Sequence, residues 1–329
     1  MRGATRYLFV FAPIALFASS CNSGPDATPA PVFGLRSESH AVRVVLGDET
    51  FARIALGTTG PICITDLRAP GGQDILRGFP FDPRKGESVD HPEQTGIWMA
   101  HASVDGHDLW NGPGGIFATE HSLRVGRKGE AIVQARVEWR DGDGSVLCTE
   151  VRTYTFRNTP AARIVDIVHR IEANGGGLVL GDVTDGFFAM RFADAFRIRD
   201  GSSAARSFSS KGARNRELRG LPARWMANVA EFVGADGMSD HVTVCILDHP
   251  RNVQHPPIWN ARTYGLVAAN PFARTAFTDD DTVVGDGAPG TYLLDGYKTL
   301  TMRYRIVVAP TVLDYNDVDV LWTGFAAEE

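Results

Sequence analysis

Two segments far apart in the sequence concentrate side chains that can hold a substrate or transfer a proton. The first is Asp90–Asn111 (DHPEQTGIWMAHASVDGHDLWN), and the second is Asp248–Phe272 (DHPRNVQHPPIWNARTYGLVAANPF). Together they contain five of the nine histidines and three of the six tryptophans. Because a proline disfavours helical geometry in the residue before it, the His-Pro steps place their imidazoles on extended or turn backbone. We therefore expect the two segments to form the walls of one pocket.

Four residues are candidates for catalytic acid, base or carboxylate partner. His91 and His255 each precede a proline, and Asp90 stands next to His91, so a carboxylate can orient or charge that ring. Asp185 lies in the loop 181–186 (GDVTDG), which supplies the kind of carboxylate that glycoside cleavage uses. Each has a plainer interpretation, since His91 can simply bond its loop to a sheet and a glycine-flanked aspartate often forms a turn.

Aromatic and polar side chains nearby predict a sugar-binding surface. The C–H faces of a sugar stack on aromatic rings, while its hydroxyl groups bind polar side chains. The strand predicted over 147–156 adds an acid and a guanidinium on one face, although a solvated ion-pair face gives the same pattern. The aromatic residues can equally fill a protein core. The candidate substrate-binding residues are Trp98, His101, Trp110, Glu150, Arg152, Trp259, Asn260, Arg262 and Tyr264.

Metal and nucleotide chemistry find little support in the motifs. His91, His101 and His107 can gather around a divalent ion with Asp90 or Asp108, but their spacing matches no compact ligand motif. The sequence also lacks the phosphate loop of NTPases, the nucleophile elbow of α/β-hydrolases and the glycine fingerprint of dinucleotide-binding proteins. We therefore expect no cofactor, with a divalent metal as a minor alternative.

The first 20 residues have the pattern of an export signal. Arg2 and Arg6 precede an apolar stretch over 7–17, and small residues stand before Cys21, the predicted site of lipidation. This apolar stretch is too short to span a membrane. The small and polar residues that follow predict a flexible tether over 21–36. We expect an exported protein, either an outer-membrane lipoprotein or a periplasmic one, that touches the membrane only through its lipid anchor.

The charge of the chain argues against nucleic acid as a partner. There are 33 basic and 39 acidic residues, and removal of Arg2 and Arg6 with the signal leaves 31 basic residues and a net charge near -8. An acidic chain without a basic patch does not suit a polyanion or an anionic surface. The expected partner is a glycan or a small sugar.

Three cysteines lie in apolar stretches of the predicted domain, at Cys63, Cys148 and Cys245. An odd number in an oxidising compartment allows at most one disulfide, and the spacing offers no metal knuckle. We therefore favour buried free thiols, with one disulfide as the alternative.

Alternating apolar and polar residues predict strands over most of the stretch 37–329. Val133, Ala135 and Val137 alternate with polar residues, and the same period recurs over 242–247. Long antiparallel strands must close or stack to bury one face. We therefore predict one all-β domain over 37–329, built as a large antiparallel β-sandwich. Two β domains remain an alternative, although no change of composition marks a boundary.

One short helix is predicted at the C-terminus. Asn316 can cap it, because this residue type accepts hydrogen bonds from the first free N–H groups of a helix. Four apolar residues at helical spacing share one face: Val318, Leu321, Trp322 and Phe325.

The same segments resemble a bacterial family that carries the name methane oxygenase PmoA, otherwise a domain of unknown function. The resemblance covers DHPEQTGIWMAHASVDGHDLW, EVRTYTF, GDVTDGFFAMR and LDHPRNVQHPPIWNARTYGLVAANPF, in this order. It implies a galactose-mutarotase-like β-supersandwich, a fold that hosts sugar epimerases, lyases and hydrolase domains. The resemblance brings no catalytic assignment. Glu93, Gln94 and Asn260 stand where members of the family often have histidines, so a function that needs those histidines would be impaired here.

These observations predict an exported lipoprotein that acts on a glycan or modified sugar. Hydrolysis and β-elimination of a glycosidic bond both suit histidine and carboxylate groups that act as acid and base. A non-catalytic carbohydrate-binding lipoprotein would use the same aromatic residues without proton transfer. A metal-dependent oxygenase is the least favoured alternative and rests on the family name alone.

Overall fold

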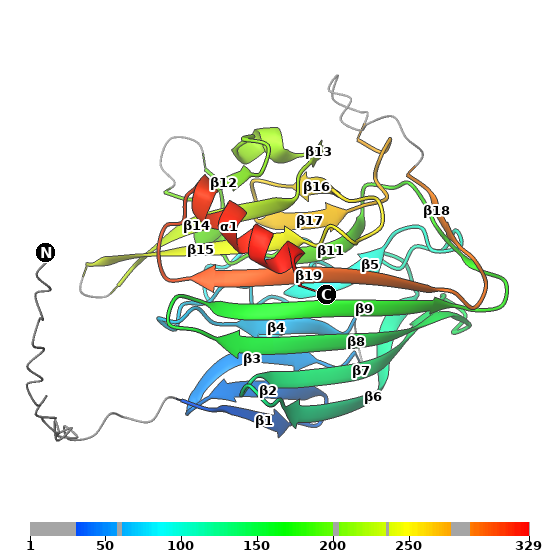
Figure 1. Cartoon of the computed structure of the whole chain (residues 1–329), viewed down its shortest axis with the longest axis horizontal. Coiled ribbons are helices and arrows are strands. Elements are labelled where there is room, and N and C mark those ends of the chain that lie inside the picture. Colours follow the sequence, from blue (N-terminus) through cyan, green and yellow to red (C-terminus); the bar gives the residue numbers. More distant parts are fainter. Residues whose placement is uncertain (1–30, 58–60, 200–203, 235–236, 278–289, 329) are drawn as a thin grey trace, which may run out of the picture. The chain divides into compact units, whose positions relative to one another are not determined.

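Two large antiparallel sheets make up most of the structure (Figure 1). The computed structural model describes residues 31–57, 61–199, 204–234, 237–277 and 290–328, and Val32–Glu329 form one compact unit. The prediction of an all-β protein with large antiparallel sheets and a short C-terminal helix is confirmed. The predicted signal peptide, Cys21 and the predicted tether up to residue 30 lie outside the described residues.

The first large sheet has nine strands within the described residues, and its central strands are buried on both faces. All five residues of Ile97–His101 are buried, which explains why this segment shows no clear alternation of apolar and polar residues. The predicted tether extended to Arg36, whereas the first strand begins at Phe33 and pairs with the second. In spatial order the strands are β1 (Phe33–Ser37), β2 (Ala41–Leu46), β3 (Glu49–Ala55), β4 (Cys63–Leu67), β5 (Ile97–His101), β11 (Gly186–Arg191), β17 (Leu266–Asn270), β16 (Ile258–Ala261) and β13 (Leu221–Pro222).

The second large sheet has eight strands in the part of the chain that the structure describes. Val133, Ala135 and Val137 are buried while Gln134 and Arg136 are exposed, so the predicted alternation is confirmed here. In spatial order the strands are β12 (Arg206–Ser209), β14 (Trp225–Val233), β15 (Ser239–Asp248), β19 (Thr299–Ala309), β9 (Arg163–Ala173), β8 (Val146–Asn158), β7 (Ala131–Arg140) and β6 (Gly115–Val125).

The core lies between the inner faces of the two sheets. Phe188 of β11 stacks on Tyr304 of β19 with ring centroids 4.2 Å apart, and Phe51 of β3 meets Phe156 of β8 edge to face at 5.8 Å. Burial of one such aromatic side chain stabilises the fold by about 2 to 3 kcal/mol, so the packed faces supply most of the stability. A small sheet of β10 (Leu178–Leu180) and β18 (Tyr292–Leu294) lies apart from both.

Helix α1 (Tyr315–Ala326) covers part of the outer face of the eight-stranded sheet (Figure 1). Val318 and Phe325 are buried against this sheet, as the helical spacing predicted. The predicted cap at Asn316 is wrong, because Asp314 accepts the N–H of Asp317 at 3.0 Å and caps the helix two residues earlier.

Two 3-10 helices complete the regular structure, η1 (Asp194–Phe196) and η2 (Asn215–Leu218). Neither these nor α1 has the length and apolar character of a membrane-crossing helix, so the described residues contain no such span.

Candidate functional site

A row of paired residues crosses the outer face of the nine-stranded sheet. Trp98 of β5 pairs with Ala189 of β11, Ala189 with Ala268 of β17, and Ala268 with Asn260 of β16. Because neighbouring residues of a strand point to opposite faces, this row lies opposite Phe188, which faces the second sheet. All four of these side chains are at most 2% exposed, so the row is covered in the structure.

A pocket of about 330 Å³ opens at the Trp98 end of this row. Trp98 and Trp110 line it with ring centroids 5.1 Å apart, and Glu93 and Asn111 supply polar atoms. The carboxylate of Asp108 accepts the backbone N–H groups of Trp110 at 2.8 Å and Asn111 at 2.9 Å, which fixes the loop. The structure therefore brings the predicted residues Trp98 and Trp110 together in one pocket.

Charged side chains converge on Asp185, which precedes β11. Burial raises the pKa of the Asp185 carboxyl group above its usual value. The positive charge of Arg262 partly lowers this pKa, the carboxylates of Asp108 and Glu93 raise it further, and His91 lowers it. His91, Glu93 and Asp108 belong to Asp90–Asn111 and Arg262 belongs to Asp248–Phe272, so both segments influence the charge state of Asp185. A carboxyl group with a raised pKa among charged partners is typical of a functional site.

Asn260 and Arg262 each have a buried polar atom without a hydrogen-bond partner within the described ranges. Asn260 is 1% exposed, yet its Oδ1 accepts no hydrogen bond, and the Nε of Arg262 is buried without an acceptor. Asn260 lies on β16 opposite Ala268, and Arg262 directly follows the end of this strand. Buried polar atoms normally bond to protein, water or ligand, so this pair indicates a surface for a polar ligand.

Two buried arginines hold the loop that carries His91, and the sequence patterns did not single them out. Arg77 and Arg191 both donate to Oδ1 of Asp90, at 2.7 and 2.5 Å, and Arg77 also donates to the carbonyl of His91 at 2.8 Å. The imidazole of His91 stacks on Tyr264, and the Arg191 guanidinium lies 4.5 Å from the same phenol ring. Asp90, predicted as a catalytic partner, therefore holds this loop in place.

His101, predicted to bind substrate, lies behind the pocket. Its side chain is buried, and its Nε2 donates to the carbonyl of Gly181 at 2.8 Å. Gly186 packs so closely that a Cβ there would lie 2.3 Å from Nδ1. Burial lowers the pKa of His101 to about 4, so the ring is neutral near pH 7. The structure thus corrects its role to support of the loop 181–185.

Glu150 and Arg152, also predicted to face a substrate, lie in the core between the sheets. Arg152 donates two hydrogen bonds to Glu150, at 2.7 and 2.8 Å, and Trp139 donates a third at 2.8 Å. Nδ1 of His169 lies 2.7 Å from the same carboxylate. Burial acts to raise the pKa of Glu150, but Arg152 and His169 hold it well below its usual range. Both residues lie on the inner face of β8 and are buried. The prediction that they bind substrate is therefore wrong, and so is the alternative of a solvent-exposed ion-pair face.

Trp259 belongs to the core as well. It is 1% exposed, and its indole N–H donates to the carbonyl of Ala223 at 2.8 Å. Since it directly precedes Asn260 on β16, its ring points to the opposite face of the sheet from the Asn260 side chain. The predicted stacking of Trp259 on a sugar is therefore corrected.

His255 forms a separate pair with Asp248. Its Nδ1 lies 2.5 Å from Oδ2 of the buried Asp248, and its ring stacks on Trp322 of α1 with centroids 6.1 Å apart. Burial raises the pKa of Asp248, and the hydrogen bond with His255 opposes this. The charges that act on Asp185 do not include His255. His255 therefore belongs to a different cluster from His91.

Metal ligands and reactive thiols are not evident in the described part of the chain. No three histidine, cysteine, aspartate or glutamate side chains there are arranged to hold a metal ion. Cys63, Cys148 and Cys245 are buried and free, as the apolar surroundings predicted, and burial raises the pKa of Cys63 to about 12.

Solved structures that resemble this chain include sugar enzymes, at low similarity. The Slr1438 protein from Synechocystis sp. PCC 6803 has a TM-score of 0.38 and 9% identity, covering 85% of this chain and 96% of its own. A galactose mutarotase related enzyme from Lactobacillus acidophilus has a TM-score of 0.33 and 8% identity, covering 85% and 98%. The galactosidase domain of an alpha-galactosidase-sucrose kinase has a TM-score of 0.32 and 10% identity, covering 85% and 41%.

A family model matches most of the domain. No curated protein matches the chain. The matching model spans residues 42–323 and includes both Asp90–Asn111 and Asp248–Phe272. Its description gives a family of unknown function and does not carry the name methane oxygenase PmoA. The chain belongs to this family, DUF6807.

Proposed function

We propose that the pocket lined by Trp98, Trp110 and Glu93 binds a sugar and that a glycosidic bond is cleaved there. The observation that carries this proposal is the position of Asp185. Its carboxyl group has a pKa raised by burial and lies within the electrostatic reach of Arg262, Glu93 and His91. Two carboxyl groups in different environments suit glycoside cleavage, in which one donates a proton and the other acts as base or nucleophile.

The binding part of the proposal rests on the composition of the walls. Trp98 and Trp110 offer aromatic surface, on which the C–H face of a pyranose can stack. Asn260 and Arg262 present polar atoms without protein partners, which hydroxyl or carboxylate groups of a sugar would satisfy. A mixture of aromatic surface and a few convergent polar groups is typical of small-molecule sites.

The chemical part assigns a role to each charged group. Asp185 retains its proton to higher pH than an ordinary aspartate and is the proposed acid. Nδ1 of His91 lies 3.2 Å from Oε1 of Glu93, and this pair is the proposed base. For hydrolysis the base would activate water, and for β-elimination it would remove a proton from the sugar carbon. Arg262 would stabilise the negative charge that develops. Glu93 thus takes the place of Asp90 and His255 in the predicted set.

The site is proposed to act outside the cytoplasm. The N-terminal signal pattern and Cys21 support export and attachment of lipid, and an acidic soluble domain suits a glycan in the cell envelope. A Cys21→Ala variant should then appear in the soluble envelope fraction, while the unaltered protein stays with membranes. Equal distribution of the two proteins would contradict lipid attachment.

Turnover and binding of a sugar panel test this proposal together. The purified protein is incubated with neutral oligosaccharides and uronate-containing oligosaccharides, and products are followed by proton NMR and by the ultraviolet absorbance of unsaturated sugars. New reducing ends without absorbance indicate hydrolysis, and absorbance indicates elimination. Asp185→Asn and Glu93→Gln should each lower kcat by about 100-fold or more, because each removes a proton-transfer group. Glu120→Gln, on an exposed strand face, serves as the matched control.

A carbohydrate-binding protein without catalysis is the second candidate. It is favoured by the unpaired polar atoms of Asn260 and Arg262, which need a ligand and no proton transfer. Calorimetric binding of a sugar by the unaltered protein, with no turnover of any panel member, would replace the catalytic proposal with this one. Absence of both binding and turnover across the panel would contradict both.

A further inference from the structure

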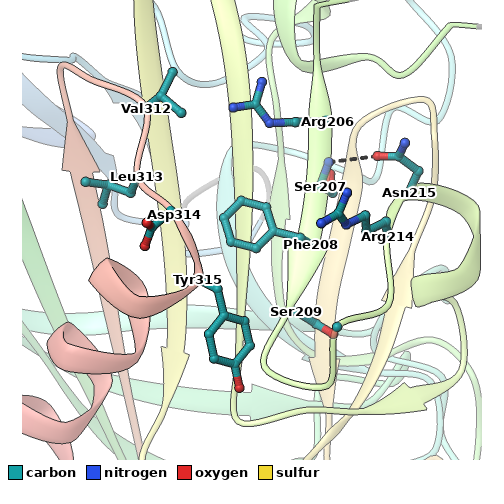
Figure 2. Close-up of a pocket in the computed structure, with 11 residues that line it drawn as sticks. Arg206, Ser207, Phe208, Ser209, Arg214, Asn215, Val312, Leu313, Asp314 and Tyr315 are labelled. Carbon is teal, nitrogen blue, oxygen red and sulfur yellow. Dashed lines mark hydrogen bonds between the residues drawn. The ribbon is translucent and has the colours of Figure 1, made fainter.

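A second pocket of about 320 Å³ lies beside the eight-stranded sheet, between the edge strand β12 and the segment that leads into α1 (Figure 2). Phe208 and Tyr315 supply aromatic surface, and Val312 and Leu313 supply aliphatic surface. The lining is mainly apolar, and the proposed sugar site shares none of it. A pocket of this size accommodates one small ring-containing molecule.

The two walls of this pocket are fixed to each other in the absence of a ligand. The hydroxyl group of Tyr315 donates to the carbonyl of Ser210 at 2.9 Å, which joins the start of α1 to the turn after β12. Trp225 packs against both aromatic walls, with ring centroids 5.9 Å from Phe208 and 5.2 Å from Tyr315. A ligand would therefore meet a preformed cavity and would lose little affinity to ordering of the protein.

Two guanidinium groups reach into this apolar space from the β12 side. Figure 2 shows Arg206 directed toward Val312 and Arg214 directed toward the ring of Phe208. No carboxylate forms an ion pair with either of them among the described residues. The one acid in the lining, Asp314, already accepts the N–H of Asp317 as the cap of α1. The pocket thus combines an apolar body with two exposed guanidinium groups that form no ion pair among the described residues.

We propose that this pocket binds a small organic acid in which a carboxylate is attached to a flat apolar ring. The ring would lie between Phe208 and Tyr315, where offset or edge-on contacts between aromatic groups are favourable. The carboxylate would accept hydrogen bonds from Arg206 and Arg214, because the planar guanidinium group matches a carboxylate in geometry and charge. The site is independent of the proposed sugar pocket and of any activity there.

Binding of phenylacetate tests the proposal, with phenylacetamide as a neutral molecule of the same shape and acetate as the charge without the ring. We expect saturable binding of phenylacetate with a Kd in the millimolar range, as suits so small a ligand. Phenylacetamide and acetate should each bind at least about tenfold more weakly, since each lacks one of the two contacts. The indole N–H signal of Trp225 should shift in the NMR spectrum, because this ring touches both aromatic walls.

Two single variants locate the charge contact. Arg206→Gln and Arg214→Gln should each weaken phenylacetate binding by about tenfold, as expected for loss of one charge-assisted hydrogen bond. Arg124→Gln is the matched control, because it removes an exposed arginine from β6 at the opposite edge of the same sheet. Equal binding of phenylacetate and phenylacetamide, unchanged binding in both variants, or shifts confined to the indoles of Trp98 and Trp110 would overturn the proposal. Failure of phenylacetate to saturate any signal would do so as well.

Discussion

The imidazole of His91 lies against the phenol ring of Tyr264, with centroids 5.3 Å apart and planes inclined by 15°. This contact joins the two segments whose composition predicted a common pocket. Gln94 also approaches Tyr264, with its side-chain amide 3.4 Å from the hydroxyl group. The contact joins His91, which forms the proposed catalytic base together with Glu93, to the turn that follows β16 and contains Arg262.

Loss of the Tyr264 ring should weaken sugar binding through His91. Tyr264→Ala removes the surface on which the imidazole rests, and we expect an affinity loss of about five- to tenfold, equivalent to about 1 kcal/mol. Tyr264→Phe keeps the ring and should bind within about twofold of the unaltered protein. Isothermal titration with the sugar identified in the panel measures both. Equal losses in the two variants would assign the effect to the hydroxyl group.

Removal of Arg262 should shift the pH dependence of turnover to higher pH. The charge of Arg262 lowers the pKa of Asp185, so Arg262→Gln raises that pKa further. Since the proposed acid acts in its protonated form, activity falls as the pH rises through this pKa, and the alkaline limb should move upward. Profiles of kcat/KM against pH for the two proteins check this. A limb that stays in place would remove Asp185 from the role of acid.

The buried pair of Glu150 and Arg152 should contribute strongly to stability. Glu150→Gln leaves the Arg152 charge without a counterion in the core, and we expect unfolding to become easier by about 3 to 5 kcal/mol. Glu120→Gln breaks an exposed pair with Arg136, whose side chains are 73% and 71% exposed, and should cost less than about 1 kcal/mol. Urea unfolding followed by fluorescence compares the two. Similar losses of unfolding free energy in the two variants would show that burial does not increase the contribution of the Glu150–Arg152 pair.

Stability should fall in mildly acidic solution because of His101. In the folded protein burial lowers the pKa of this ring to about 4, against an ordinary value of 6.5, so the unfolded chain binds the proton first. Its contribution is complete above pH 6.5 and is lost as the pH falls toward 4, by about 3 kcal/mol in the free energy of unfolding.

His101→Gln should remove this part of the acid sensitivity, since glutamine does not titrate. His121→Gln, on an exposed position of β6, is the control and should leave the pH dependence unchanged. Urea unfolding at a series of pH values gives the comparison. Parallel curves for the His101 variant and the unaltered protein would contradict the assignment.

The three described cysteines should resist thiol reagents while the protein is folded. Burial raises the pKa of Cys63 to about 12 and raises the pKa of Cys148 and Cys245 as well, so thiolate is scarce and inaccessible. Domain protein that begins after Cys21 should show no rapid reaction with iodoacetamide, and all three thiols should react in denaturant. Rapid labelling of any one of them by mass spectrometry would show local opening.

The period of the sequence was enough to identify the architecture. In β7, Val133 and Gln134 alternate between core and solvent because each successive side chain of a strand points to the other face. Long strands of this kind bury one face by closing into a barrel or by stacking, and the large number of strands favoured the antiparallel sandwich. The helix near the C-terminus was predicted from the helical spacing of its apolar residues. Identification of Asp314 as its cap required the position of the Asp314 carboxylate.

Which face each residue of a central strand uses was decided by the tertiary structure. Trp259 and Asn260 are neighbours in a strand buried on both sides, so apolar character does not show which of them faces the second sheet. Glu150 and Arg152 carry charges that usually indicate a surface, yet Trp139 and His169 provide partners for the carboxylate in the core. Trp139 and His169 lie on the strands that neighbour β8, so the sequence of β8 alone does not reveal these partners.

Turn-forming and aromatic residues recur in Asp90–Asn111 and Asp248–Phe272, so composition alone was enough to predict that these segments hold the residue types of a site. Which of these residues act together depends on how the strands pair and pack. Strand pairing joins the backbone of Asp185 to Ala102, within Asp90–Asn111, whereas His255 pairs with Asp248. No sequence pattern identified the buried Arg77 and Arg191, because their role is to bind Asp90, which is distant from Arg191 in the sequence. Electrostatic neighbours depend on strand order and register, which the chain adopts only when the two sheets pack.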